Sequence, residues 1–193
     1  LRVPVRLGVE TTAEAIKEYA PDFVIVATGA KPRPIPFDIT SLARDVRVMH
    51  AWDYLLDPDS LSAGRTVTII GGGMVGLETA DLLTTRGSKA VTVIEAMGHI
   101  AHGMARNNRM ELIERLASRG TKFTLDTQVL KAESTQLRVR VSNEEDASVD
   151  IGDVLMIAIG PVSNRDVVPA IEASGIEYAL AKAADVRLEV YDI

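Results

Sequence analysis

One glycine-rich segment constrains the fold of this chain more than any other feature. An apolar run at 66–70 leads into the pattern G-x-G-x-x-G, and a helix-forming run follows at 74–86. The glycines of the pattern are Gly71, Gly73 and Gly76. A strand that enters a helix through such a turn points unpaired backbone N–H groups, and the positive end of the helix dipole, at one spot. The segment therefore predicts a strand–turn–helix unit whose turn suits a pyrophosphate.

The glycines have separate expected roles. Gly71 permits the tight turn, Gly73 lets phosphates approach the backbone, and Gly76 lets the helix and the strand pack closely. A second apolar strand, expected at 90–94, ends on Glu95, where an acidic side chain accepts hydrogen bonds from the hydroxyls of an adenosine ribose. The alternative is a plain strand–helix turn with a solvated Glu95. The complete strand–helix–strand pattern favours nucleotide binding over that alternative.

The surroundings of Glu95 favour NAD(H) over NADP(H). Its carboxylate would repel the 2′-phosphate of NADP, which usually needs an arginine close by. Residues 96–100 supply no arginine. We therefore expect NAD(H) as the cofactor of this turn.

The composition excludes several classes of function. The net charge is −6 and no stretch concentrates lysine and arginine, which argues against a nucleic-acid or anionic-membrane surface. The 193 residues include no cysteine for a disulfide or an iron–sulfur cluster, and no apolar run approaches the ~20 residues that span a bilayer.

His99 and His102 lack a third metal donor, and no Ser–His–Asp or Cys–His arrangement is recognisable. We expect a cytoplasmic protein with no metal ligand and no catalytic side chain in this chain.

The N-terminal part of the chain predicts a strand at 3–7, a helix, and a second strand at 23–27. The threonines at 11–12 can cap the helix, and Pro21 ends it. The second strand is continuously apolar, which is typical of a strand buried in a parallel sheet. The proline-rich run at 31–36 holds an extended path, which we interpret as a crossing between two lobes.

Two further helices are expected. A short one is expected near 51–55, where Trp52 and Tyr54 pack the helix, with stacking on a ring as the less favoured alternative, and a longer one spans 107–119. Asn107 or Asn108 can cap the longer helix, and Gly120 suits the left-handed residue after its end. The apolar stripe of this helix comprises Met110, Ile113, Leu116 and Ala117.

The second half of the chain turns to strands. A strand is expected at 122–125, and the alternation of apolar and polar residues over 127–157 predicts a small antiparallel meander. Residues 142–146 form a solvated turn within it, and the meander ends in an apolar strand at 154–159.

Two apolar strands end in similar turns, at 27–29 and 158–160, on either side of the nucleotide unit. The chain therefore leaves a first lobe, builds a second and returns. We expect one more strand at 186–193, and both ends read as cuts within a longer protein because strand-like runs reach them.

Four segments together resemble the pyridine nucleotide–disulphide oxidoreductase superfamily, in which an NAD(P)H-binding domain is inserted into an FAD-binding domain. The matching segments are 24–32 (VIVATGAKP), 70–80 (IGGGMVGLETA), 91–95 (VTVIE) and 156–164 (MIAIGPVSN). The resemblance implies an α/β fold, with a Rossmann-like parallel sheet and an antiparallel β-meander. It implies a partial FAD-domain segment and crossover at 1–47, the NAD(P)H-binding domain at 48–162, and a partial FAD-domain return at 163–193.

The resemblance also assigns residues. Glu78 would approach the nicotinamide end of the cofactor, Gly160 would lie near the nicotinamide, and Thr28 and Gly29 would lie near the flavin. Alternatively, Glu78 is a first-turn carboxylate that stabilises the helix dipole, and the other three only form turns. The complete predicted cofactor-binding set is Gly71, Gly72, Gly73, Met74, Val75, Gly76, Glu78, Glu95, Ala158, Gly160, Thr28 and Gly29.

Residues 108–116 are most similar to the C-terminal part of 2-enoate and 2,4-dienoyl-CoA reductases. The implied function is an NAD(H)-binding domain of a flavin-dependent oxidoreductase, with FAD held in the full-length protein by an FAD lobe outside this chain. The implied partners are the dinucleotide and the remainder of the same polypeptide, including a flavin barrel, while a homo-oligomer stays open. One alternative is a structural or sensing module that binds ADP or NAD. Another is a methyltransferase that binds S-adenosylmethionine, which the meander and the paired turns disfavour.

Overall fold

The chain divides into two compact units. A computed structural model describes residues 3–102, 104–142, 147–181 and 189–190. The smaller unit combines Leu1–Lys31 with Pro161–Ile193, and the larger unit is Pro32–Gly160. The compact units thus change over near residues 31 and 160, whereas the domain boundaries inferred from the resemblance lie at 47 and 162. The assignment of FAD and NAD(P)H domains to these segments stays a prediction.

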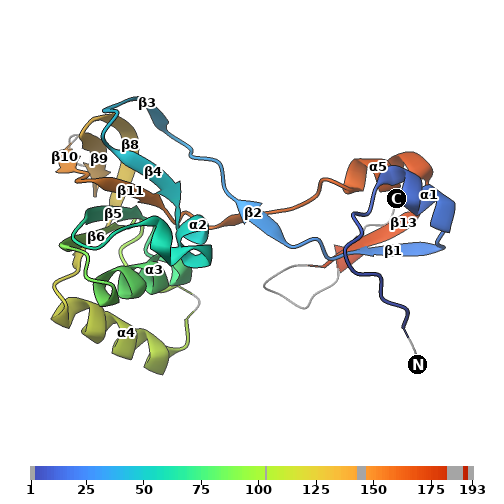
Figure 1. Ribbon diagram of the computed structural model, residues 1–193, viewed down its shortest axis with the longest axis horizontal. Helices are drawn as coiled ribbons and strands as arrows, with labels where there is room; N and C mark the ends of the chain where they lie inside the picture. The colour runs from blue at the N-terminus through green and yellow to red at the C-terminus, as the bar shows by residue number, and fades with distance from the viewer. Residues whose placement is uncertain (1–2, 103, 143–146, 182–188, 191–193) are drawn as a thin grey trace. The chain divides into compact units, whose positions relative to one another are not determined.

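The larger unit is built on a parallel sheet in the order β4-β11-β5-β6-β7, so the predicted α/β class is confirmed (Figure 1). The strands are β4 (Arg47–His50), β5 (Thr66–Ile70), β6 (Ala90–Ile94), β7 (Lys122–Thr124) and β11 (Val154–Ile157). The predicted strand, helix and strand around the glycine motif are confirmed to within one residue, with α3 at Met74–Thr85.

Both faces of this sheet are covered. The helices α2 (Ala51–Leu56), α3 and α4 (Arg106–Ser118) lie on one face, and a short 3-10 turn, η1 (Pro58–Ser60), follows α2. Val67 and Ile69 of β5 pack toward the helices, while Ile70 packs toward Leu137 and Val139 of a second sheet on the other face. The central strands β5 and β11 are mostly apolar because both of their faces are buried.

The second sheet contains the predicted antiparallel meander. Its order is β10-β9-β8-β3, with β8 (Thr127–Ser134), β9 (Gln136–Val141) and β10 (Ala147–Asp150) antiparallel. The structure adds β3 (Asp38–Leu42), which pairs parallel to β8 and was not expected from the sequence. The last predicted strand of the meander, β11, leaves that sheet and inserts between β4 and β5. Most of the turn predicted at 142–146 lies outside the described residues.

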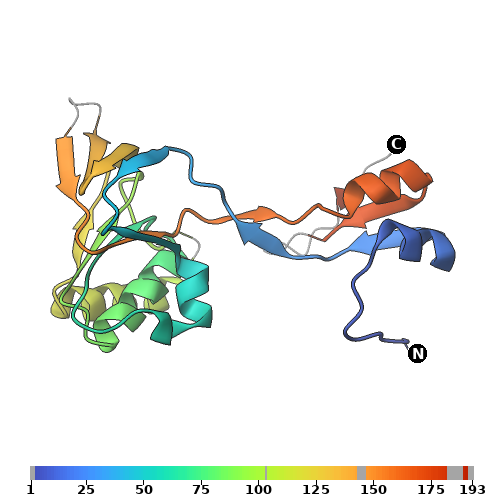
Figure 2. The ribbon, with the colours of Figure 1, turned by 45° about the horizontal axis from the view of Figure 1, so that its top comes forward.

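The smaller unit packs two helices on a short sheet (Figure 2). Its elements are α1 (Ala13–Tyr19), β1 (Phe23–Val26), β2 (Ala30–Pro32), β12 (Pro161–Ser163), α5 (Val168–Ser174), β13 (Glu177–Leu180) and β14 (Glu189–Val190). β1 is parallel to β13, β14 is antiparallel to β13, and β2 pairs with β12. The predicted cap is confirmed, since the Thr12 hydroxyl accepts a hydrogen bond from the Ala15 N–H at 3.2 Å. Ile16, Val26 and Ile171 form the centre of the core of this unit.

Two predictions for the smaller unit are wrong, and a third lies mostly outside the described residues. The strand predicted at 3–7 is wrong, because the segment pairs with no strand among the described residues and its Pro4 has no N–H to donate. The prediction that β1 is buried on both faces is also wrong, because Ile25 is 60% exposed while the alternate residues Val24 and Val26 contact the core. Of the strand predicted at 186–193, only β14 lies within the described residues.

The helix α4 differs from its prediction in its start and its buried face. It begins at Arg106 after Ala105, with no side-chain cap, so the predicted asparagine cap is wrong. Leu112 and Leu116, one turn apart, form the buried face, whereas Met110 of the predicted stripe is exposed. Gly120 has the predicted left-handed backbone, with φ of +81°. None of the helices within the described ranges combines the length and the apolar character needed to cross a bilayer.

Candidate functional site

The carboxyl ends of four parallel strands are aligned at one edge of the sheet. Strand pairing places His50, Ile157, Ile70 and Ile94 in one row, at the ends of β4, β11, β5 and β6. The chain proceeds from β5 outward to β6 and β7, whereas β11 and β4 lie on the opposite side of β5. The strand order therefore reverses between β5 and β11, and ligands of open α/β sheets bind at such a switch point.

The glycine turn lies at this switch point, and two of its glycines are required by the protein itself. Gly71 has φ of +108°, and a Cβ atom there would lie 2.4 Å from the carbonyl oxygen of Ala158. A Cβ atom at Gly76 would lie 1.9 Å from the carbonyl oxygen of Gly71. A side chain at Gly71 would therefore push the turn away from the segment after β11, and one at Gly76 would push α3 away from the turn.

Gly73 differs from the other two. Its φ of −72° and ψ of −175° suit any residue, and a Cβ atom there would meet nothing within 4 Å. Within the described part of the chain, the N–H groups of residues 73–76 have no acceptor, and α3 has no side-chain cap. Open space therefore lies in front of uncapped helix N–H groups, which is the arrangement that fits a phosphate.

Glu95 lies against the same turn. Its Oε2 atom accepts a hydrogen bond of 2.6 Å from the Gly72 N–H, and its Oε1 atom accepts one of 2.9 Å from the Met97 N–H. The residue is only 8% exposed, so the alternative of a solvated Glu95 is wrong. Each carboxylate oxygen has a second acceptor position, which leaves capacity for ribose hydroxyls.

Residues 96–101, which follow Glu95, also contact the glycine turn, and this contact was not predicted from the sequence. The Ala101 N–H donates a 2.7 Å hydrogen bond to the Gly72 carbonyl, and a Cβ atom on Gly72 would lie 2.6 Å from Cγ2 of Ile100. Gly72 is therefore a glycine because residues 96–101 pack on it. The sequence did contain a sign of this packing: Gly72 occupies a position of the G-x-G-x-x-G pattern that accepts any residue, yet it is glycine.

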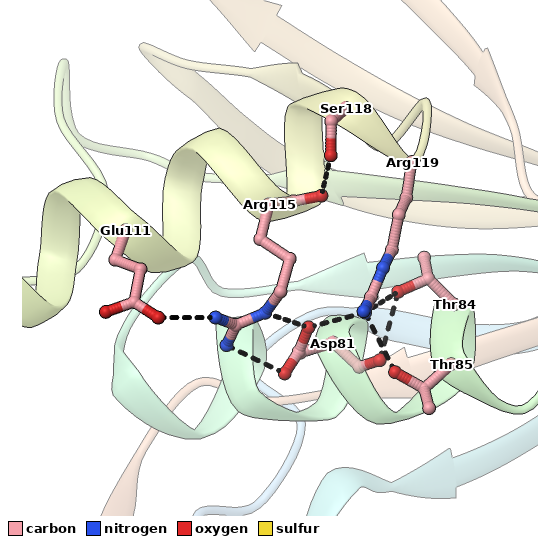
Figure 3. Close-up of polar contacts among 7 residues, drawn as sticks. All are labelled: Asp81, Thr84, Thr85, Glu111, Arg115, Ser118 and Arg119. Atoms are coloured by element: carbon pink, nitrogen blue, oxygen red, sulfur yellow. Dashed lines mark hydrogen bonds and ion pairs between the residues drawn. The ribbon is translucent and has the colours of Figure 1, made fainter.

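The helix that carries the turn is held to α4 by a polar network (Figure 3). Arg115 donates two hydrogen bonds to the Asp81 carboxylate, at 2.9 and 3.0 Å, and Arg119 donates one at 2.8 Å. Arg119 also donates to the Thr85 hydroxyl, and Arg115 pairs with Glu111 one turn earlier. The hydrogen bond from Arg115 lowers the pKa of Asp81 and is the largest cause of that shift.

The other predicted residues of the larger unit lie on both sides of the turn. Met74 and Val75 occupy the first turn of α3, whereas Glu78 is exposed in the second turn, so its alternative as a first-turn carboxylate is wrong. Ala158 and Gly160 follow β11 and are partly buried. The Gly160 carbonyl accepts a hydrogen bond from the Arg33 N–H, and Gly160 has φ of +84°.

Thr28 and Gly29 belong to the smaller unit, where they face residue 164. The Thr28 hydroxyl donates a 2.6 Å hydrogen bond to the Asn164 carbonyl, and the Asn164 N–H donates one of 2.9 Å to the Gly29 carbonyl. The turn at 27–29 is therefore bonded to the returning segment at Asn164, four residues after the similar turn at 158–160. The assignment of Thr28 and Gly29 to a flavin stays a prediction.

Two other candidates can be placed. His99 and His102 face each other, with 3.4 Å between Nε2 and Nδ1, and no group of three metal-ligating side chains occurs in the described residues. Tyr54 of α2 is buried in the core, as expected. Trp52 was expected to pack the same helix, but it belongs to none of the described cores and lines a small hollow beside Val75.

Comparison with known proteins agrees with this architecture. Among the solved structures that share the fold is a 2-naphthoyl-CoA reductase, with a TM-score of 0.73 and 23% identity over 94% of this chain and 27% of that one. Another is the histamine dehydrogenase of Rhizobium sp. 4-9, with a TM-score of 0.72 and 15% identity over 86% of this chain and 27% of that one.

Among curated relatives, bilirubin reductase of Mediterraneibacter gnavus is 33% identical over 98% of this chain and 29% of its own length. Cinnamate reductase of Clostridium sporogenes is 30% identical over 86% of the chain and 24% of its length, and NADH oxidase of Thermoanaerobacter brockii is 37% identical over 61% and 18%. The chain thus spans less than a third of the length of these relatives.

The family described as pyridine nucleotide-disulphide oxidoreductase matches residues 6–189. This match covers almost the whole chain and confirms the resemblance predicted from the four sequence segments. The chain belongs to the pyridine nucleotide-disulphide oxidoreductase family.

Proposed function

We propose that the larger unit binds NADH and presents it for hydride transfer to a flavin in a flavin-dependent oxidoreductase. The observation that carries this proposal is the combination at Gly73: a glycine that no packing contact requires, in front of four N–H groups that have no acceptor among the described residues. Gly71 and Gly76 are explained by packing, whereas no packing contact requires Gly73, whose bare backbone leaves room for a group that approaches it. A pyrophosphate has the charge and the acceptors that this place needs.

Glu95 sets which dinucleotide binds. The carboxylate is fixed by the Gly72 and Met97 N–H groups, so its free acceptor positions are already oriented before a ribose arrives. A 2′-phosphate there would meet a buried negative charge, and residues 96–100 contain no arginine to offset it. This arrangement supports NADH as the bound form.

The chemistry is that of the cofactors: nicotinamide gives a hydride and flavin accepts it. The chain supplies binding and orientation, through the turn, Glu95 and the strand ends. The names of the relatives, NADH oxidase, bilirubin reductase and cinnamate reductase, support a reductase role for the complete protein. We place the complete protein with the 2-enoate and 2,4-dienoyl-CoA reductase group, with FAD held outside the larger unit.

Calorimetric titration of the chain with NADH, NADPH and ADP tests the proposal. We expect NADH to bind with a micromolar to submillimolar dissociation constant and NADPH to bind more weakly. The absence of binding heat from NADH would contradict the proposal, and tighter binding of NADPH would contradict the role of Glu95. ADP that binds as tightly as NADH would instead favour a structural nucleotide module.

A further inference from the structure

The proposed function uses the glycine turn and Glu95 but leaves one part of the strand edge unassigned. Beyond β5, at the ends of β11 and β4, a small hollow opens beside His50 and Trp52. Val75, in the first turn of α3, and Ala158 also line the hollow. The same Ala158 lies against Gly71, so the hollow directly borders the phosphate turn.

Trp52 is placed unusually for the one tryptophan of the chain. Its neighbours on α2, Ala51 and Tyr54, are fully buried in the core on the helix side of the sheet. Trp52 itself remains half-buried and contributes to none of the cores formed by the described residues. A large aromatic side chain that lines a hollow instead of a core is suited to packing against a ligand ring.

We infer that Trp52 packs against the nicotinamide ring of the bound cofactor, an inference that rests on the proposed function. Glu95 places the adenosine half over β6, so the nicotinamide half extends across β5 toward β11 and β4. The hollow is small, so the ring lies across its mouth, with one face on the indole of Trp52. The oxidised ring is positively charged, and the face of an indole attracts such a cation. Trp52 is thus a cofactor-positioning residue.

The single tryptophan allows a direct test by fluorescence. The full 193-residue chain is titrated with NAD⁺ and, separately, with ADP-ribose, which has the pyrophosphate but no nicotinamide. NAD⁺ should quench the emission of Trp52 by contact, and ADP-ribose should bind without comparable quenching. By calorimetry, Trp52→Ala should weaken NAD⁺ about five- to tenfold and leave ADP-ribose unchanged. Trp52→Phe should restore most of the affinity for NAD⁺.

The control variant is Leu56→Ala, which removes an exposed apolar side chain from the same helix and should change neither affinity. NAD⁺ binding without quenching would overturn the inference while leaving the proposed function intact. The same would follow if ADP-ribose quenched equally, or if Trp52→Ala weakened both ligands alike. Failure of both ligands to bind would contradict the proposed function, and this inference with it.

Discussion

At the scale of single residues, the glycines of one turn fall into two kinds: those that the packing of the protein requires, and one that only ligand binding is expected to require. Gly76 is required because its Cα lies against the backbone of Gly71, and Gly72 is required because Ile100 packs on it. Gly73 has no such neighbour. Substitutions in one short segment should therefore have opposite consequences for stability and for binding.

We predict that Gly73→Ala lowers the free energy of unfolding by only about 1 kcal/mol, the cost of alanine at a helix N-cap, because the new methyl group meets no protein atom. The same methyl group would occupy the approach of the pyrophosphate, so the affinity for NADH should fall about tenfold or more. Gly76→Ala should destabilise the protein by about 3 kcal/mol or more, because its methyl group would collide with the Gly71 carbonyl. Urea unfolding and calorimetry of both variants test this contrast, and equal loss of stability in the two would contradict it.

A second prediction concerns Glu95. Glu95→Gln keeps the size of the side chain and an acceptor for the Gly72 N–H, but removes the negative charge and the acceptor for the Met97 N–H. The preference for NADH over NADPH should therefore shrink, mainly through tighter binding of NADPH, by about 1–2 kcal/mol. Competition titrations with the two cofactors measure this preference. An unchanged ratio would show that Glu95 does not face the ribose.

At the scale of elements, α4 holds the helix that carries the turn through Asp81 (Figure 3). The Arg115 hydrogen bond lowers the pKa of Asp81 in the folded state. This interaction therefore contributes fully above the ordinary aspartate pKa of about 3.9, and the contribution is lost as the pH falls through the lowered pKa.

Asp81→Asn should lower the free energy of unfolding at neutral pH by about 1 kcal/mol, a modest value because the Arg115 side chain is 37% exposed. The difference from the unsubstituted protein should be smaller at about pH 3 than at neutral pH, because Asp81 of the unfolded chain is protonated below about 3.9 while its folded-state pKa is lower. Urea unfolding at both pH values measures it. Glu111→Gln is the matched control, since Glu111 is 79% exposed and its loss should change stability by less than about 0.5 kcal/mol. A difference that does not depend on pH would contradict the role of the Asp81 carboxylate.

The same scale shows what the sequence could predict. The strands β5 and β6 and the helix α3 could be predicted almost to the residue, because buried apolar runs and turn glycines are local signals. The strands β3 and β4 could not, because they are short and only partly buried, and they are held by pairing with distant strands. Because α2 directly follows β4, the position of Trp52 beside the carboxyl ends of the strands could not be predicted either. The contact of Ile100 on Gly72 joins residues 28 apart and leaves no periodic pattern.

At the scale of the whole molecule, the cores of the two units share no residue among those described. The two cores of the larger unit are made only of residues within 32–160, and the core around Ile16 and Ile171 belongs wholly to the smaller unit. A unit with its own hydrophobic core is expected to fold independently.

We therefore predict that residues 32–160, expressed alone, fold and bind NADH within about threefold of the affinity of the whole chain. Far-UV circular dichroism and calorimetry would measure folding and affinity. An unfolded or non-binding fragment would show that the nucleotide site depends on residues of the smaller unit.

The most direct test of the central claim is to follow the backbone amide resonances of ¹⁵N-labelled chain while NAD⁺ is added. A diphosphate seated on the turn should shift the amides of residues 72–76 and of Glu95 and Met97 most strongly, and all of them with one saturation curve. Saturable binding that leaves those amides unmoved, with shifts confined to other surfaces, would contradict the claim that this turn is the dinucleotide site.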